Sequence, residues 1–119
     1  MILQTLPAAC GWRLFKIQGQ LDFTAAPAVQ AALSYVSAHD PSDLLIDLED
    51  VKKADEVGVS ALKSVVRRLL ADHQQLHVAV IAKDAWLAEA LNDESLSPRV
   101  PVYHSGDEAL HAISLHRAA

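Results

Sequence analysis

The residues best placed to do chemistry lie in one short segment, Asp55-Glu56-Val57-Gly58-Val59, where a loop runs into a helix-like stretch. A helix N-terminus has unpaired N–H groups and a partial positive charge, so it favours an anion or a phosphorylated hydroxyl. Asp55 is a good N-cap for such a helix, and Glu56 in its first turn interacts favourably with the helix dipole. Neither residue directly before Gly58 carries a hydroxyl. We therefore predict a helix start whose negative charge is permanent.

Asp47 is a second candidate, because it ends a short apolar run and Lys83 follows a later one. An aspartate and a lysine at strand ends resemble the phosphoacceptor and the lysine of response-regulator receivers. That similarity implies an acidic pair after the first strand to hold magnesium, and Asp22 alone is a poor match. We interpret Asp47 as a strand-end carboxylate satisfied by backbone donors. A receiver-like phosphoacceptor role for Asp47 is the alternative.

Signals for catalysis are absent from the sequence. The six histidines are dispersed and show no metal-ligand spacing with Cys10, which is the one cysteine. The chain contains no Gly-x-Ser-x-Gly elbow, Walker A loop or dinucleotide fingerprint. Trp12 and Trp86 are interpreted as core or rim residues. These patterns predict a protein that is not an enzyme and that uses neither a metal nor a cofactor.

Length and composition bound the fold and the cellular location. The 119 residues, 51% apolar and 21% charged, predict a single domain over residues 1–119. A formal charge of −5, with scattered basic residues, disfavours a nucleic-acid partner. Apolar stretches are too short to span a membrane, the first residues lack a basic n-region, and one cysteine suits a reducing compartment. We expect a cytoplasmic protein without direct membrane insertion, and the sequence leaves its oligomeric state open.

Hydrophobic periodicity divides the chain into alternating strands and helices. Short apolar or alternating runs predict strands at residues 2–6, 12–17, 44–48, 76–81 and 100–103. Helices are expected after Thr24 as N-cap, over residues 57–72, after Asp84 as N-cap, and after a capping box of Ser105 and Glu108. The residues between the strand at 44–48 and Asp55 are expected to form a loop. This order, β-β-α-β-α-β-α-β-α, predicts an α/β layer with a largely parallel sheet.

Several motifs in this order resemble the STAS domain, the module named for sulfate transporters and anti-sigma factor antagonists. Gly19-Gln20-Leu21-Asp22 resembles the family's Gly-x-Leu-Asp, and Ala25-Ala26-Pro27 resembles the Ala-Pro start of the helix that follows it. Residues 44–48 with Val51 resemble the family's buried strand and the turn after it. Asp55-x-x-Gly58-Val59 resembles its Asp-Ser-Ser-Gly-Leu signature. Residues 102–110 are also family-like. The resemblance covers nearly the whole chain. It implies a small mixed, largely parallel β-sheet with helices packed mainly on one side.

The resemblance also implies how such a domain works. Anti-sigma factor antagonists of this family bind a serine kinase that is also an anti-sigma factor, and the kinase phosphorylates the serine beside the glycine. The corresponding residue here is Val57, which cannot be phosphorylated. The partner-binding residues implied by the resemblance are Gln20, Asp22, Thr24, Asp55, Glu56, Val57, Gly58, Val59 and Ser60. We thus predict a non-catalytic bacterial signalling module, of the kind used in partner switching and transcription regulation, whose usual phosphoacceptor is replaced.

Other hydroxyls and other partners stay open at this point. Ser60, Ser64 and Thr24 are the remaining candidates for phosphorylation near the signature, although mid-helix serines are usually surface residues and Thr24 is expected to be a cap. A signalling histidine kinase is a further partner class. STAS-like subunits also clamp the ATPase of phospholipid ABC importers, so a transporter ATPase is the alternative partner.

Overall fold

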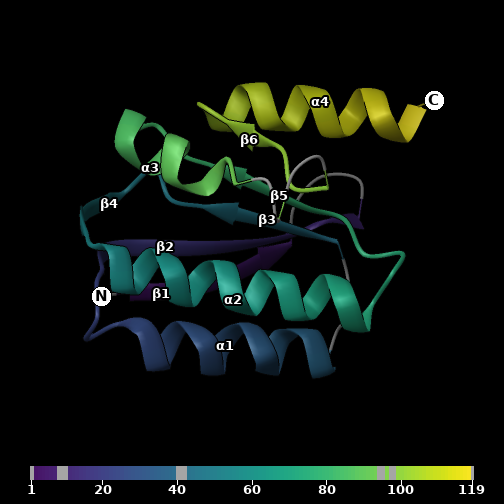
Figure 1. The fold of residues 1–119 in the computed structure, drawn as a ribbon. Coiled ribbons are helices and arrows are strands. Elements are labelled where there is room, and N and C mark those ends of the chain that lie inside the picture. The colour runs from purple at the N-terminus through teal and green to yellow at the C-terminus, as the bar shows by residue number, and fades with distance from the viewer. Residues whose placement is uncertain (1, 8–10, 40–42, 94–95, 97–98, 119) are drawn as a thin grey trace.

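The computed structural model describes residues 2–7, 11–39, 43–93, 96 and 99–118 (Figure 1). The elements follow in the order β1 (Ile2–Pro7), β2 (Arg13–Leu21), α1 (Ala26–His39), β3 (Leu44–Asp47), β4 (Val51–Ala54), α2 (Glu56–Asp72), β5 (Val78–Ile81), α3 (Ala85–Leu91), β6 (Val102–Tyr103) and α4 (Gly106–Ala118). Cys10 lies outside the described residues.

One mixed sheet organises these elements. Its strand order is β1-β2-β3-β5-β6, with β4 paired to β2 beside this path. All of these pairings are parallel except that of β1 with β2. The long strand β2 pairs first with β3, through Arg13–Lys16, and then with β4, through Gly19–Leu21. The register shifts at Gly19, whose φ of 91° is open to glycine without steric cost, so one strand serves both partners.

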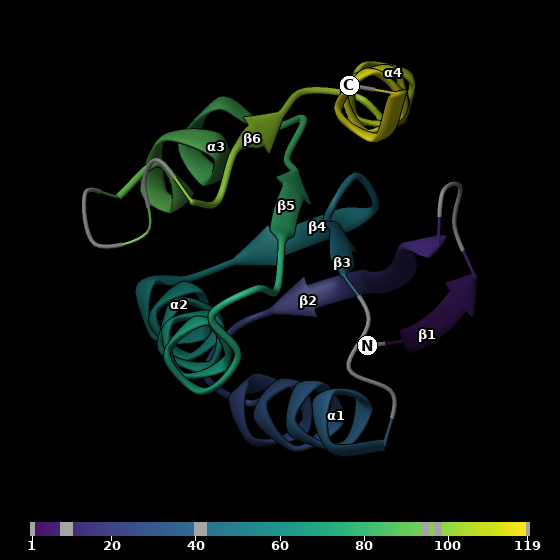
Figure 2. The same cartoon turned by 90° about the vertical axis from the view of Figure 1, so that its right-hand side faces the viewer.

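Helices cover both faces of the sheet. Helices α1 and α2 lie side by side on one face, and α4 lies on the opposite face (Figures 1 and 2). Helix α3 contacts α2 and β6. The main core lies between the sheet and α1, α2 and α3, and its fully buried side chains include Phe15, Ile17, Leu33, Ile46 and Leu62. A smaller core under α4 contains Trp12, Leu45, Ala79, Ile81, Ala109 and Ile113. The arrangement confirms the predicted α/β class.

The burial of each element explains its sequence pattern. All four residues of β3 and of β5 are buried, because these central strands are covered on both faces, and this is why they read as continuous apolar runs. Helix α2 is amphipathic and buries Gly58, Val59, Leu62, Val65, Val66, Leu69 and Leu70. The predicted capping box of α4 is half formed: Ser105 Oγ accepts from Glu108 N at 3.1 Å, while Glu108 Oε2 accepts at 3.4 Å from the N–H of His104, the residue before the N-cap.

Two local features differ from the predictions. The segment expected to be a loop contains strand β4, because the second half of β2 offers free backbone groups that Val51–Ala54 pair with. This short strand carries two exposed lysines, so it has little β periodicity to detect. Before α1, the carboxylate of Asp22 accepts from the N–H groups of Thr24 and Ala25, at 3.1 and 3.2 Å. The Thr24 hydroxyl donates to Asp22 at 2.6 Å, so Thr24 is not the capping acceptor that we expected.

Candidate functional site

Two aspartates meet where β2 and β4 end. Leu21 pairs with Ala54 in parallel strands, so the residues that follow, Asp22 and Asp55, leave the sheet at the same edge. Asp55 is the N-cap of α2: its Oδ1 accepts from Gly58 N at 2.8 Å and its Oδ2 accepts from Phe23 N at 3.2 Å. Its own N–H donates to the Leu21 carbonyl at 3.2 Å. Asp55 therefore holds the start of α2 against the loop that joins β2 to α1.

Gly58 allows these two segments to touch. A Cβ atom at this position would overlap the carbonyl group of Leu21 and lie 2.7 Å from the backbone nitrogen of Asp22. These neighbours are backbone atoms, which cannot rotate away as the end of a side chain can. Glycine is thus required here by the close approach of α2 to the end of β2, not by the helix itself.

Asp22 organises the other side of the junction. Its carboxylate is buried and accepts from the Thr24 hydroxyl and from the two N–H groups described above. The hydrogen bond from Thr24 lowers the pKa of Asp22 most, and the two backbone bonds and the charge of Lys53 lower it further against the opposing effect of burial. Asp22 is therefore a structural anion that shapes the loop.

The predicted partner-binding residues divide into a supporting set and a surface set. The side chains of Asp22 and Val59 are buried, as is Gly58, and Asp55 is half-buried. The exposed ones are Gln20, Thr24, Glu56, Val57 and Ser60. Val57, the predicted counterpart of a signature serine, is 56% exposed, and its side chain has no hydroxyl.

Two aromatic side chains add to this surface. Phe23 is 65% exposed and follows Asp22 in the loop, and its N–H is the one bound by Asp55. Trp86, at the start of α3, is 48% exposed and lines a shallow depression of about 270 Å³ with Glu56, Val59, Ser60, Lys63 and Ala90. We name the exposed residues Phe23, Glu56, Val57, Ser60 and Trp86 the docking surface. The sequence placed Trp86 only as a core or rim residue, because its distance from α2 along the chain hides their contact.

The docking surface rests on a rigid frame. Lys63 of α2 donates to Asp93 Oδ2 at 2.9 Å and to the Ala90 carbonyl at 3.2 Å, so it ties the end of α3 to α2. The side chain of Lys63 is only 17% exposed, which limits solvent screening of the pair. Trp86 is thereby held at a set place relative to Glu56 and Ser60.

Charge near the junction is mixed. The N-terminus of α2 contributes a partial positive charge, and Lys52 and Lys53 are exposed on the neighbouring strand β4. Glu56 is the acidic residue of the first turn of α2. One fixed negative charge thus occupies a setting that favours anions.

The remaining candidates are placed as follows. Ser60 and Ser64 are exposed on α2, and Thr24 is exposed while its hydroxyl donates to Asp22. Asp47 is 7% exposed at the end of β3, and its Oδ1 accepts from Glu49 N at 2.9 Å, as the strand-end interpretation predicts. Within the described ranges no three histidine, cysteine or acidic side chains gather as metal ligands. No helix in that part of the chain is long and apolar enough to cross a lipid bilayer.

Comparison with known families agrees with this geometry. The STAS domain family model matches residues 4–109. The chain belongs to the STAS domain family. The predicted family is thus confirmed. No curated protein matches the sequence of this STAS domain significantly.

Solved structures of other STAS proteins share the fold. The anti-sigma factor antagonist SpoIIAA in its unphosphorylated form superposes with a TM-score of 0.71 at 16% identity, over 99% of this STAS domain and 100% of that chain. An anti-sigma factor antagonist from Mycobacterium paratuberculosis gives a TM-score of 0.68 at 26% identity, over 95% of each chain. A sulfate transporter family protein from Wolinella succinogenes gives 0.68 at 20% identity, over 98% of this chain and 93% of the other.

The STAS fold also bears on the receiver interpretation. Flavodoxin-like receivers have the strand order 2-1-3-4-5 in a parallel sheet. Here the path is β1-β2-β3-β5-β6, with an antiparallel first strand. Asp47 therefore lies at a strand end of a different fold.

Proposed function

We propose that this STAS domain is a non-catalytic regulatory module that binds a protein partner on its docking surface, in the manner of an anti-sigma factor antagonist. The observation that carries the proposal is the exposure of Glu56 and Val57 on a helix start that Asp55 and Gly58 hold rigidly against the β2–α1 loop. The similarity to anti-sigma factor antagonists supports the class of partner. Among the partners considered, we favour a kinase-like anti-sigma factor in the cytoplasm.

The composition of the docking surface suits protein binding. Exposed aromatic side chains supply large contact area at a low cost in side-chain entropy, and they are enriched among residues that dominate binding energy. Phe23, Val57 and Trp86 offer such contacts around the single charge of Glu56. Backbone rigidity at the site keeps the ordering cost of binding small.

We further propose that binding at this surface is not controlled by phosphorylation of the signature. Val57 has no hydroxyl to accept a phosphoryl group, and a phosphate would bring about −1.5 to −2 charge where Glu56 brings only a single one. The partner is then released only by a change in the partner or by a change in the amount of either protein.

Site-specific photo-crosslinking tests the docking surface directly. The full chain with p-benzoylphenylalanine in place of Val57 is expressed in the native host and irradiated, and the crosslinked proteins are identified by mass. We expect one regulatory protein with a kinase-like ATP-binding domain. The matched control carries the same group in place of Leu110, which is 39% exposed on α4. Equal crosslinking at both positions contradicts the proposed surface, and capture of a P-loop ATPase favours the transporter role.

Restoring the hydroxyl tests the second part of the proposal. The captured partner and ATP are incubated with the natural protein and with the Val57→Ser variant, and intact mass is measured. We expect no change for the natural protein and the addition of one phosphate to Val57→Ser. Phosphorylation of the natural protein would assign the modification to Ser60, Ser64 or Thr24 instead. Equal partner affinity of the natural protein and Glu56→Ser would remove any role of the fixed charge.

A further inference from the structure

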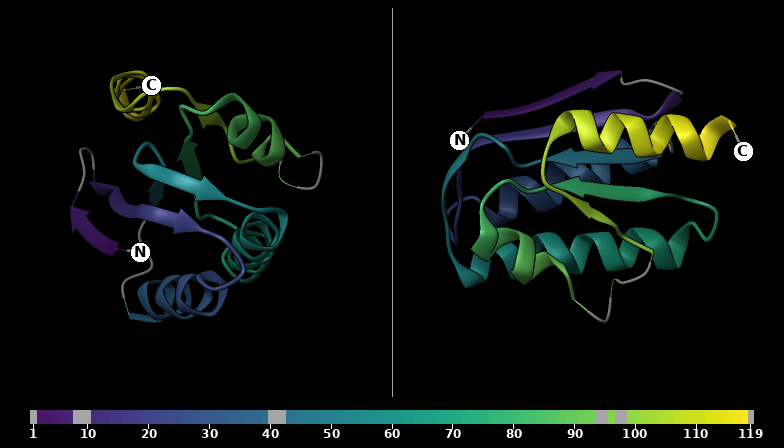
Figure 3. Two further views of the ribbon diagram at one scale, coloured as in Figure 1. Left: turned by 90° about the vertical axis from the view of Figure 1, so that its left-hand side faces the viewer. Right: turned by 90° about the horizontal axis from the view of Figure 1, so that it is seen from above.

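A pocket lies far from the docking surface. It has a volume of about 460 Å³ and is lined by Trp12, Gln74, Leu76, His77, Val78, Ala79, Arg99, Pro101, Tyr103, Ala112 and Ile113. Trp12, His77 and Pro101 come directly before the parallel strands β2, β5 and β6, so the hollow opens at the edge of the sheet where these strands begin. Asp22 and Asp55 follow strands and lie at the other edge. Helix α4, which Figure 3 shows over one face of the sheet, contacts β5 and β6.

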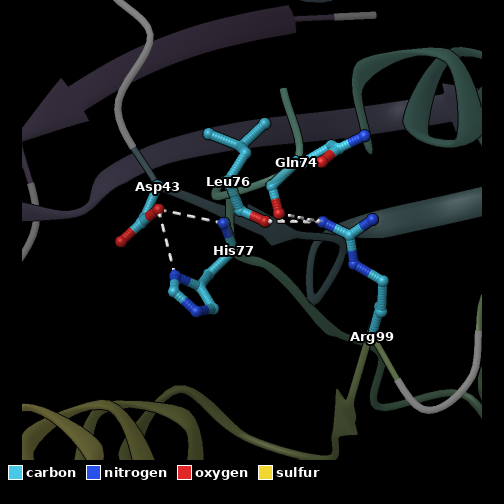
Figure 4. A network of polar contacts seen from close by, with 5 residues as sticks. All are labelled: Asp43, Gln74, Leu76, His77 and Arg99. Carbon is cyan, nitrogen blue, oxygen red and sulfur yellow. Dashed lines mark hydrogen bonds and ion pairs between the residues drawn. The ribbon is translucent and has the colours of Figure 1, made fainter. Parts of the chain in front are cut away.

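Arg99 is held in place at the rim of the pocket. Its Nη2 donates to the carbonyls of Gln74 and Leu76, at 3.0 and 3.3 Å, and its Nη1 donates to the carbonyl of Leu70 at 3.3 Å (Figure 4). A guanidinium has five N–H donors, so these bonds leave two for other acceptors. The cation is therefore ordered by neutral carbonyl groups, and its charge is not neutralised by them.

His77 forms the facing wall. Its backbone N–H donates to Asp43 Oδ1 at 2.9 Å, and its Nδ1 lies 3.4 Å from the same oxygen. Figure 4 shows the imidazole pointing from this contact toward α4. The ring centroid of His77 is 6.3 Å from that of Trp12, with the planes tilted by 31°. Burial, and then the charge of Glu108, raises the pKa of Tyr103, so this phenol is a neutral hydrogen-bonding group in the pocket wall.

The charges of the lining favour an anion. The protein has a net charge of −5, yet among the residues that the structure describes the lining contains an arginine and a histidine and no aspartate or glutamate. Two carboxylates act on the lining from outside it: Asp43 accepts from the N–H of His77, and Glu108 influences Tyr103. Apart from Gln74, the other described lining residues are apolar or aromatic. A small-molecule site commonly combines such apolar walls with one or two fixed polar groups, in a volume of about 300–1,000 Å³.

We propose that this pocket binds a small planar aromatic anion, with its ring system between Trp12, Tyr103 and Ile113 and its carboxylate against the guanidinium of Arg99. The two remaining donors of Arg99, Nε–H and one Nη1–H, lie on different edges of the guanidinium, so each can give a carboxylate a single charge-assisted hydrogen bond. The volume suits one bicyclic or two linked rings. The site is independent of the docking surface, so either proposal can fail without the other.

Two fluorescent probes test the site. One is 8-anilinonaphthalene-1-sulfonate, an aromatic anion, and the other is its neutral analogue N-phenyl-1-naphthylamine. Both are titrated into the folded protein, and a Trp86→Phe variant leaves Trp12 as the only tryptophan whose quenching reports the pocket. We expect saturable binding of one anionic probe per chain, with energy transfer from Trp12. Indole-3-acetate should displace this probe, and uncharged indole should displace it far less.

Three variants decide the assignment. Arg99→Gln should lower the affinity for the anionic probe about tenfold and the affinity for the neutral probe less than about twofold, because a charge-assisted contact is lost. Arg67→Gln, which removes an exposed arginine of α2, is the matched control and should change neither. Ala112→Trp should block both probes by filling the pocket. Circular dichroism confirms folding, and if Ala112→Trp fails to fold, the ratio of probe affinities in Arg99→Gln decides alone.

The opposite outcomes overturn the proposal. An equal loss of affinity for both probes in Arg99→Gln would show that the arginine only supports the pocket. Unchanged anion binding in Arg99→Gln or in a folded Ala112→Trp would place the probe elsewhere. Absence of saturable binding or of Trp12 quenching would remove the site.

Discussion

At Gly58, helix α2 comes into backbone contact with the end of β2. The Gly58→Ala variant should lower the free energy of unfolding by about 1–3 kcal/mol, because the overpacked Cβ outweighs the better helix propensity of alanine. Urea denaturation measures the change. Gly106→Ala is the matched control, since its Cβ would meet only the mobile carboxylate of Glu49 at 3.2 Å. A loss in Gly106→Ala as large as that in Gly58→Ala would contradict the steric explanation.

Asp22 makes part of the stability depend on pH. Its native pKa lies below the ordinary 3.8, chiefly through the Thr24 hydroxyl, so in acid the unfolded chain takes up this proton first. The contribution is fully present above pH 3.8 and is lost as the pH falls through the lowered native pKa. Thr24→Val should flatten this acid-side loss in urea denaturation measured between pH 5 and pH 2. Asp50, whose pKa is lowered by Lys16 and Gln18, should still make the free energy of unfolding fall with pH in this variant. If the total dependence of that free energy on pH were the same in Thr24→Val as in the natural protein, this would count against the Thr24 bond.

At the scale of elements, a partly buried ion pair ties α3 to α2. Lys63 bridges from α2 to Asp93 and to the Ala90 carbonyl, and Trp86 is carried on the helix so held. We expect the Lys63→Met variant to speed amide hydrogen exchange in Leu87–Leu91 while leaving α1 unchanged, because the loss is local. The destabilisation should be about 1 kcal/mol. Arg68→Met, at an exposed position of α2, is the control. Equal exchange in both variants would show that the bridge does not anchor α3.

Across the whole molecule, two cores share the central strands. Leu44 and Ile46 of β3 face the main core, while Leu45 faces the smaller core under α4. Trp12 reports the smaller core and Trp86 reports the α3 side, so Trp12→Phe and Trp86→Phe give one probe for each. We expect coincident urea transitions for the two variants after correction for their stabilities, since neither core can open without disturbing β3 and β5. A separate early transition seen by Trp12 alone would show that α4 unfolds independently.

The element order was predictable because it depends on local sequence. The buried strands β3 and β5 are continuous apolar runs, α2 is strongly amphipathic, and Asp55, Asp84 and Ser105 are good caps. Strand β4 was missed because it forms by pairing with the free edge of β2, and the local sequence of Val51–Ala54 does not indicate this pairing. The role of Asp22 at the start of α1 was missed as well, because its carboxylate binds the hydroxyl of Thr24 and the N–H groups of Thr24 and Ala25.

For the candidate site, the sequence by itself determined the residue types: a capping Asp55, a glycine at position 58, and Glu56 and Val57 between them. The tertiary structure alone decided which of them a partner can reach, and it added Phe23 and Trp86 to the docking surface. It also brought Trp12, His77 and Arg99 around one pocket. The reason is physical. Caps and helix dipoles act over a single turn, whereas exposure and pockets depend on which surfaces remain uncovered after distant elements have packed.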